Sequence, residues 1–198
     1  HRHQRMATGT LRHGLGRPDE ALGLVGLAYS MAIGGGHGGA RLALAETAAY
    51  QGWCYAMAGD AQACRRALGQ AEERFAKAAA EDVPEWLAYF NAAELNGLRG
   101  NALRILGRRL PAAAKEARPL LWQALQERPT SFNRSRTLDL IALSVAHTLA
   151  GDLDEAVVVG REALAGVATL TSPRSLVRLR ELERAIRPLA GAHAEVAE

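Results

Sequence analysis

Residues 52–71, which read GWCYAMAGDAQACRRALGQA, decide the fold of this chain of 198 residues. Gly59 and Asp60 divide the stretch into two segments whose apolar residues recur with a helical period. A glycine just after a helix supplies the left-handed conformation that ends it, and an aspartate can cap the helix that follows. We therefore expect a helical hairpin whose first helix ends at Gly59 and whose second helix begins after Asp60.

The same pattern recurs along the chain. Turn glycines follow one another at intervals of 43, 48 and 44 residues: Gly16, Gly59, Gly107 and Gly151. A small residue precedes each by seven positions: Gly9, Gly52, Gly100 and Ser144. Small residues also follow at five and twelve positions: Ala21, Ala28, Cys64, Ala71, Ala156 and Ala163. The third unit fits with about five extra residues in its turn, which brings Ala117, Leu121 and Ala124 to equivalent places. Because small residues let two helices approach closely, the spacing predicts repeated helical hairpins.

The composition agrees with an all-α fold. The chain holds 40 Ala and 28 Leu but only 4 Ile and 9 Val, and alanine and leucine favour helices over strands. Two cysteines cannot form a disulfide framework, and we expect reduced thiols in a cytoplasmic protein. The net charge of +3 is too small to indicate a nucleic-acid surface, and no apolar run is long enough for a membrane span. These features exclude a β-sandwich, a membrane protein and a secreted disulfide scaffold.

We expect one domain over residues 1–198, built as a right-handed α-solenoid of three to four degenerate hairpins. The expected hairpins cover about residues 5–32, 41–80, 85–127 and 134–170. A capping helix over 173–189 begins with Ser172 and Pro173 and carries an apolar stripe with a charged outer face. Within the third hairpin, the first helix is expected over 85–106. Since the chain begins at His1 and not at Met, we expect a piece of a longer protein.

The spacing of small residues resembles that of the tetratricopeptide repeat. The matching positions are Gly52, Tyr55, Gly59, Cys64, Leu68 and Ala71, then Gly100, Leu103, Gly107, Ala117, Leu121, Ala124 and Pro129, and more loosely Ser144, His147, Gly151, Ala156, Gly160 and Ala163. The resemblance covers nearly the whole chain, although the repeat is longer than the 34 residues of that family. It implies a protein- or peptide-binding array in which the first helix of each hairpin lines a concave groove.

A second resemblance rests on EDVPEWLAYFNAAELNG at 81–97, GDLDEA at 151–156 and RLRELERA at 178–185. These segments are similar to the C-terminal repeat region of actinobacterial helix-turn-helix transcriptional regulators. The resemblance implies the sensor or interaction part of a regulator. DNA would be bound through an upstream domain that this chain lacks, because no helix-turn-helix is recognisable in residues 1–40.

The repeat resemblance places a ligand-binding groove on named residues. Carried over by position, the groove holds Glu46, Trp53, Glu94, Asn101 and Arg104. Tyr55 takes a buried repeat position. Offsets of three and four place Trp86, Tyr89 or Phe90 and then Ala93 on one helical stripe. Aromatic residues with a few polar groups suit a peptide, a protein segment or a small effector, whereas the alternative places these aromatics in an ordinary core.

Other candidate sites favour structural interpretations. The glycines of 34–39, with His37, could cradle phosphate, but no strand precedes them and we interpret them as an inter-repeat loop. Cys54 and Cys64 lack an activating base and are expected in the core. The Arg134–Arg136 segment and the last helix could contact phosphate, but interleaved acids favour a solvated cap. We expect no catalytic residues, metal or cofactor. The alternative function is a scaffold for homodimerisation through the terminal hairpin or the last helix.

Overall fold

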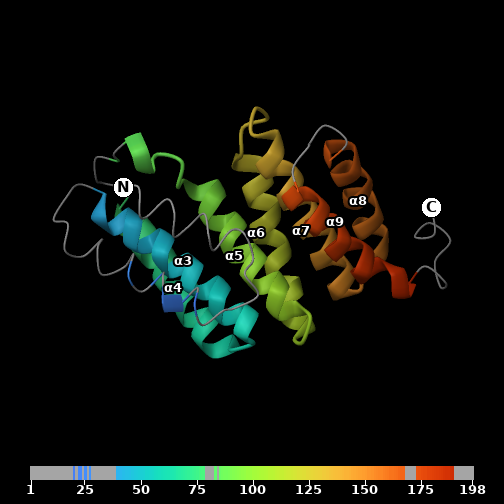
Figure 1. Ribbon diagram of the computed structural model, residues 1–198, viewed down its shortest axis with the longest axis horizontal. Helices are drawn as coiled ribbons and strands as arrows, with labels where there is room; N and C mark the ends of the chain where they lie inside the picture. Colours follow the sequence, from blue (N-terminus) through green and yellow to red (C-terminus); the bar gives the residue numbers. More distant parts are fainter. Residues whose placement is uncertain are drawn as a thin grey trace. The chain divides into compact units, whose positions relative to one another are not determined.

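The computed structural model describes residues 39–78, 85–167 and 173–189, together with Glu20, Leu22, Gly23, Val25, Leu27 and Val83. Within this part of the chain there are seven α-helices and no strand, which confirms the all-α prediction. The bounds are α3 Ala40–Ala58, α4 Ala61–Ala78, η1 Glu85–Leu87, α5 Ala92–Gly107, α6 Pro111–Glu127, α7 Asn133–Ala150, α8 Leu153–Val167, α9 Pro173–Ile186 and η2 Arg187–Leu189 (Figure 1). The first predicted hairpin, 5–32, lies almost entirely outside the described residues, as do Gly9, Gly16 and residues 34–38.

The turns at Gly59 and Gly151 form as the sequence predicts. Both glycines adopt the left-handed conformation, with φ of 82° and 88°, and their amides donate to carbonyls of the helix that ends there. Asp60 Oδ1 accepts a hydrogen bond of 2.9 Å from the Ala63 amide and so caps α4. Pro173 is the first residue of α9, as expected for a proline that needs no amide partner.

Gly107 behaves differently from the other turn glycines, and the prediction of a left-handed glycine there is wrong. It is the last residue of α5, and the positive-φ glycines of the described residues are Gly39, Gly59 and Gly151. A Cβ at Gly107 would lie 2.7 Å from the Ala114 Cβ and 3.0 Å from the Ala114 backbone. Gly107 is therefore required by the close approach of α5 to α6. The connection itself is short, because α6 begins at Pro111.

The prediction of one helix over 85–106 is also wrong. The segment begins as the 3-10 helix η1, passes through a turn, and becomes helical again at Ala92. Asn91 Oδ1 accepts a 3.1 Å hydrogen bond from the Glu94 amide, so the new helix has its own N-cap. The predicted helical stripe through residues 86–93 consequently does not exist. Phe90 enters the core and Tyr89 stays partly exposed.

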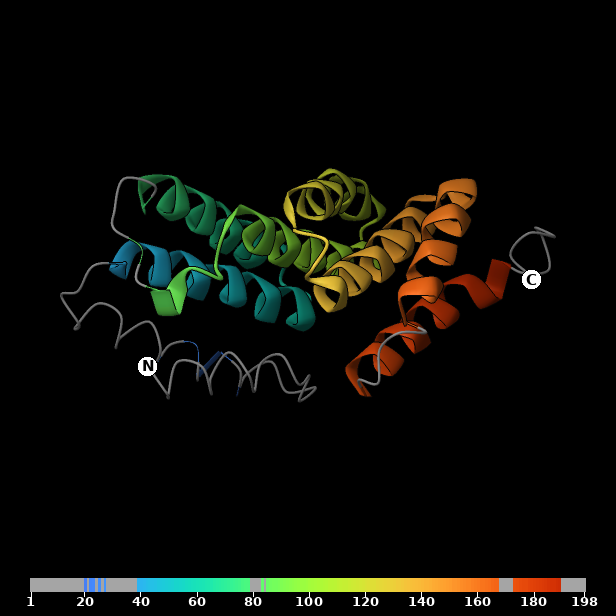
Figure 2. The same cartoon turned by 90° about the horizontal axis from the view of Figure 1, so that it is seen from above.

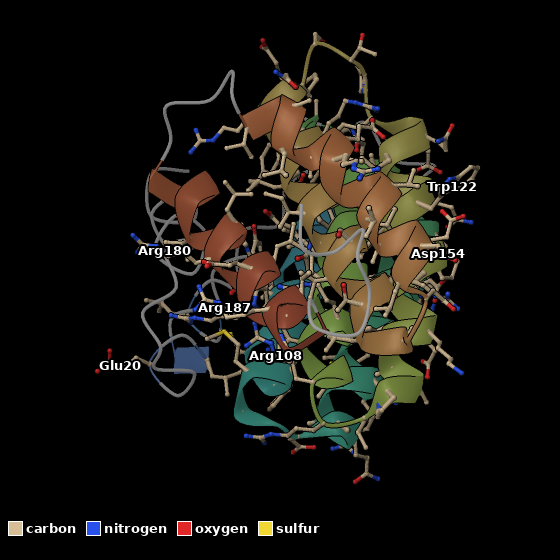
Figure 3. The ribbon with its side chains drawn as sticks, turned by 90° about the vertical axis from the view of Figure 1, so that its right-hand side faces the viewer. Glu20, Arg108, Trp122, Asp154, Arg180 and Arg187 are labelled. Atoms are coloured by element: carbon tan, nitrogen blue, oxygen red, sulfur yellow. The ribbon has the colours of Figure 1, made fainter. Side chains whose placement is uncertain are left out.

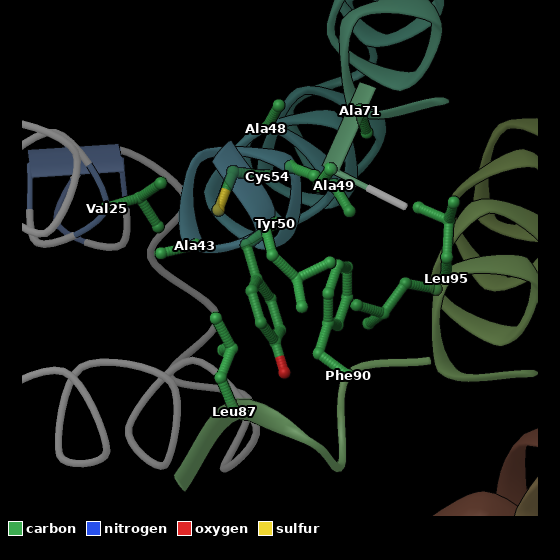
Figure 4. Packing of buried hydrophobic residues seen from close by; sticks show 14 residues of the cluster. Val25, Ala43, Ala48, Ala49, Tyr50, Cys54, Ala71, Leu87, Phe90 and Leu95 are labelled. Atoms are coloured by element: carbon green, nitrogen blue, oxygen red, sulfur yellow. The ribbon is translucent and has the colours of Figure 1, made fainter. Parts of the chain in front are cut away.

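The contacts of the chain group into two units, residues 1–102 and 103–198, with the boundary inside α5. In the first unit α3 and α4 lie side by side (Figure 2). Their core cluster is shown in Figure 4, where Tyr50 points between Leu87 and Phe90. In the second unit α7 packs against α6, α8 and α9. The expectation of a single repeat domain stays a prediction.

Small residues stand at the close contacts within the hairpins. A Cβ at Gly52 would lie 2.4 Å from Leu68 Cδ2, so α3 approaches α4 through this glycine. In α7 and α8, a Cβ at Gly160 would lie 3.1 Å from Ser144 Oγ. Gly52 and Ser144 are the small residues predicted seven positions before the turns, and their packing agrees with the close approach that the spacing predicts.

Candidate functional site

Most of the buried polar side chains belong to three helices, α3, α5 and α7, which are the first helices of the predicted hairpins. Among the described residues, those on the three helices are Glu46, Thr47, Asn101, Arg104, Thr137, Asp139, Ser144 and Thr148. One further buried polar residue, Arg128, lies at the end of α6. The buried residues of the second helices α4, α6 and α8 are all Ala, Leu, Cys or Gly. Because a buried polar group costs free energy unless it is paired, the partners of these side chains matter for the stability of α3, α5 and α7.

Two of the predicted groove residues lie on α3. Glu46 is only 4% exposed, and its Oε1 accepts a 2.7 Å hydrogen bond from Tyr89 Oη. Trp53 packs partly buried against the core cluster, and its ring stacks on Tyr50 with centroids 6.4 Å apart. The core contact of Trp53 matches the alternative that the sequence left open. Tyr89 joins Glu46 from the irregular segment before α5, which no periodic pattern predicts.

The other three predicted residues lie on α5. Glu94 is in the first turn and half-buried, with its amide bonded to the Asn91 side chain. Asn101 is 9% exposed and its Nδ2 donates a 2.9 Å hydrogen bond to the Gly97 carbonyl. Arg104 is 1% exposed and contacts Glu181 of α9. Each contact described above joins a predicted groove residue to a residue outside the predicted set. Arg104 belongs to the second unit, and the other four predicted residues belong to the first.

Three guanidinium groups surround the carboxylate of Glu181. Arg178 Nη1 donates a 2.8 Å hydrogen bond to Oε2, Arg104 Nη1 lies 3.4 Å from Oε2, and Arg108 Nη2 lies 3.7 Å from Oε1. Burial lowers the pKa of Arg104 to about 9, and the charges of Arg178 and Arg108 act in the same direction. Burial alone would raise the pKa of Glu181, but Arg104, Arg178 and Arg108 together hold it below its ordinary value. We call Arg104, Arg108, Arg178 and Glu181 the arginine cluster.

A second charged group, at the turn between α7 and α8, involves His147. Asp152 makes an ion pair with Arg118, and its Oδ2 lies 3.9 Å from His147 Nδ1. Burial lowers the pKa of His147, and the positive charge of Arg118 adds to the effect, although Glu155 opposes it. A pKa below the ordinary value favours the neutral imidazole at physiological pH.

The cysteines are buried, as the sequence predicts. Cys54 and Cys64 are both free thiols. Burial raises the pKa of each to about 11, so the thiolate that would be needed for nucleophilic chemistry is scarce at neutral pH. Among the described residues, no group of three or more His, Cys, Asp or Glu side chains could hold a metal ion. None of the described helices combines the length and the apolar character needed to span a bilayer.

The sequence predicts only one residue of the arginine cluster as a site residue. The repeat resemblance predicts Arg104 as a site residue, but the sequence pattern of the last helix predicts a solvated capping face for Arg178 and Glu181. The signal that could have found them is the spacing of Arg178 and Glu181 beside Leu182, which is buried in α9. Figure 3 shows the side chains with the right-hand side of Figure 1 facing the viewer, and it labels Arg108 and the exposed Trp122. No family model, curated protein or solved structure matches the chain.

Proposed function

We propose that this chain is a non-catalytic recognition domain that binds a peptide, a protein segment or a small effector. In this proposal α3–α4, α5–α6 and α7–α8 are degenerate tetratricopeptide-like hairpins of a right-handed solenoid, and α9 is its cap. The domain would serve as the sensor part of a bacterial transcriptional regulator, as the resemblance to actinobacterial regulators implies. DNA would then be bound by a separate domain.

The observation that carries the proposal is the concentration of buried polar residues on the first helices. In helical repeat arrays the first helices form one layer, and the extended surface of such arrays is what binds partners. Purely structural helices would be expected to bury apolar residues alone, as α4, α6 and α8 do. Glu46 and Asn101 of the first unit and Arg104 of the second instead bury a carboxylate, an amide and a guanidinium on α3 and α5. A few polar groups among apolar side chains are typical of ligand sites.

The experiment is a binding screen with an immobilised library of random peptides, followed by calorimetry of the selected peptides. Trp53→Ala and Arg104→Lys should weaken binding, because both residues lie on the layer that the proposal assigns to recognition. Trp122→Ala is the matched control, since Trp122 is an exposed aromatic on the second helix α6. Equal affinities for wild type and the two first-helix variants, with a loss in Trp122→Ala, would contradict the proposal.

A scaffold for homodimerisation is the second candidate, favoured by exposed apolar side chains at the end of the chain. Val158 and Leu164 on α8 and Val177 on α9 are each more than half exposed. Large apolar side chains at the surface can form an interface between copies. Sedimentation velocity over a range of concentrations separates the two functions. A monomer that binds peptide supports recognition, and a dimer that loses its association in Val158→Asp supports the scaffold.

A further inference from the structure

The arginine cluster holds more positive charge than its own carboxylate neutralises. Three guanidinium groups face Glu181, which carries a single negative charge. The shortest contact, 2.8 Å, belongs to Arg178 and is a true hydrogen bond, whereas Arg104 and Arg108 stand at 3.4 and 3.7 Å. Counted over the four residues of the cluster, three guanidinium groups and one carboxylate leave an excess of two positive charges.

Arg104 has the least satisfied side chain of the cluster. Its Nε, Nη1 and Nη2 atoms are buried and make no hydrogen bond within the described part of the chain. A buried guanidinium without acceptors is costly, because each unmade hydrogen bond leaves a desolvated donor. With its pKa lowered only to about 9, Arg104 keeps its charge at neutral pH. The Glu181 carboxylate at 3.4 Å is thus close enough for an ion pair, but it leaves the Arg104 donors without a well-aligned acceptor.

The exposure of the cluster gives a ligand a way in. Arg104 is 1% exposed and Arg178 is mostly buried, but the Arg108 side chain is 51% exposed. A small anion can reach Arg108 from solvent, and Arg108 and Arg104 have the Glu181 carboxylate as a common neighbour. The planar fork of a guanidinium matches the oxygens of phosphate, and such charge-assisted bonds are stronger than neutral ones.

We propose that Arg104, Arg108 and Arg178 form a binding site for a small phosphoryl dianion, either inorganic phosphate or the phosphate group of a small monoester, beside the Glu181 carboxylate. The site rests on the proposed function, for which it names the chemical class of the small effector. Two negative charges balance the two excess positive charges. Glu181 holds Arg178 and Arg104 in place and, by its own charge, lowers the affinity for anions.

The test is a titration of the full chain with inorganic phosphate and, separately, with adenosine monophosphate, at constant ionic strength set with chloride. Arg108→Gln should weaken both affinities about tenfold or more, because one charge-assisted contact is lost. Arg109→Gln is the matched control: it removes the same charge from the next residue, which is also exposed. Glu181→Gln should bind phosphate more tightly than wild type, with folding checked by circular dichroism.

Each outcome decides the proposal. Tighter binding of the monoester identifies an organophosphate effector, and tighter binding of phosphate identifies the free ion; both support the site if Arg108→Gln weakens them selectively. The absence of saturable binding, or equal losses in Arg108→Gln and Arg109→Gln, would overturn it. Malonate and sulfate are added as competitors of bound phosphate. If malonate displaces phosphate more strongly than sulfate does, the phosphoryl assignment is wrong and the site binds a dicarboxylate. If phosphate fails while Trp53→Ala still weakens peptide binding, the recognition function stands without this site.

Discussion

The first and second helices of the hairpins bury their residues in different ways. In α7 the run from Asp139 to Ala146 is buried without interruption, and α3 is nearly as enclosed. In α6 the buried residues form a single stripe, at Ala113, Ala114, Ala117, Leu121, Ala124 and Leu125, and the opposite face is exposed. A helix enclosed on most sides can keep charged groups in low dielectric, whereas a one-sided helix contributes mainly apolar contacts. The one-sided α6 therefore contributes mainly apolar packing, whereas α3 and α7 also enclose polar side chains.

The largest effect is expected from the buried ion pair of α7. Arg128 Nε lies 3.0 Å from Asp139 Oδ2, and both side chains are less than 10% exposed. Asp139→Ala should lower the free energy of unfolding by about 3–5 kcal/mol, because it leaves a buried guanidinium without its carboxylate. Chemical denaturation measures the loss. Glu73→Ala is the control on α4, where Glu73 pairs with Lys77 at a fully exposed position, and it should unfold like wild type. Comparable losses in both variants would remove the distinction between the helices.

The next effect tests the one-sided burial of α6 with two adjacent residues. Leu121 is fully buried and Trp122 is 56% exposed. Leu121→Ala should cost about 2–5 kcal/mol through lost contacts and a cavity. Trp122→Ala should change stability by no more than about 0.5 kcal/mol, as exposed positions do. Denaturant unfolding gives both changes in the free energy of unfolding. A large loss of stability in Trp122→Ala would contradict the prediction, because it would show that the outer face of α6 makes packing contacts.

Helix existence was predictable wherever a turn glycine and a cap stood between two periodic segments. Gly59 with Asp60 and Gly151 with Asp152 satisfy both conditions, and the helix ends found there agree with the prediction to within a few residues. The sequence also carried the signal for the break at Asn91, because Asn91 followed by Glu94 is an N-cap pattern. The apolar period across residues 86–93 concealed it. Gly107 led to a wrong prediction because a glycine can serve two purposes that the sequence does not distinguish. Here it allows α5 to pack closely against Ala114, and it does not adopt a left-handed turn conformation.

The candidate site was less predictable than the fold. Repeat position led to Arg104 and Glu46, but their partners Glu181 and Tyr89 lie 77 and 43 residues away in sequence. Neither periodicity nor composition can show that a solvated-looking face of the last helix meets a guanidinium on α5. Contacts between residues far apart in the sequence depend on how the helices pack, and no local pattern of residues encodes that packing.

A smaller effect is expected where the helices of the first hairpin touch. Gly52→Ala should destabilise by about 1–3 kcal/mol, because the new methyl group would overlap Leu68 Cδ2 and Cγ. Gly69→Ala is the matched substitution on α4, where a Cβ meets nothing within 4 Å. It should stabilise by about 0.5–1 kcal/mol, since alanine restricts the unfolded chain and favours helix. Thermal unfolding of the two variants should thus shift in opposite directions, and parallel shifts would show that α3 and α4 do not approach at Gly52.

The smallest effect concerns His147, on the last turn of α7 where the enclosed helix reaches the surface. Its pKa in the folded state is lowered by burial and by Arg118, so the unfolded state binds a proton first as the pH falls. The stabilising contribution is complete above the unfolded pKa of about 6.5 and is lost as the pH falls from there through the lower pKa of the folded state. His147→Gln cannot titrate and should flatten the dependence of stability on pH in this window. Denaturation of both proteins at a series of pH values between about 7.5 and about 5 measures the difference. An identical decline in the variant would show that the end of α7 is as open to water as the outer face of a second helix.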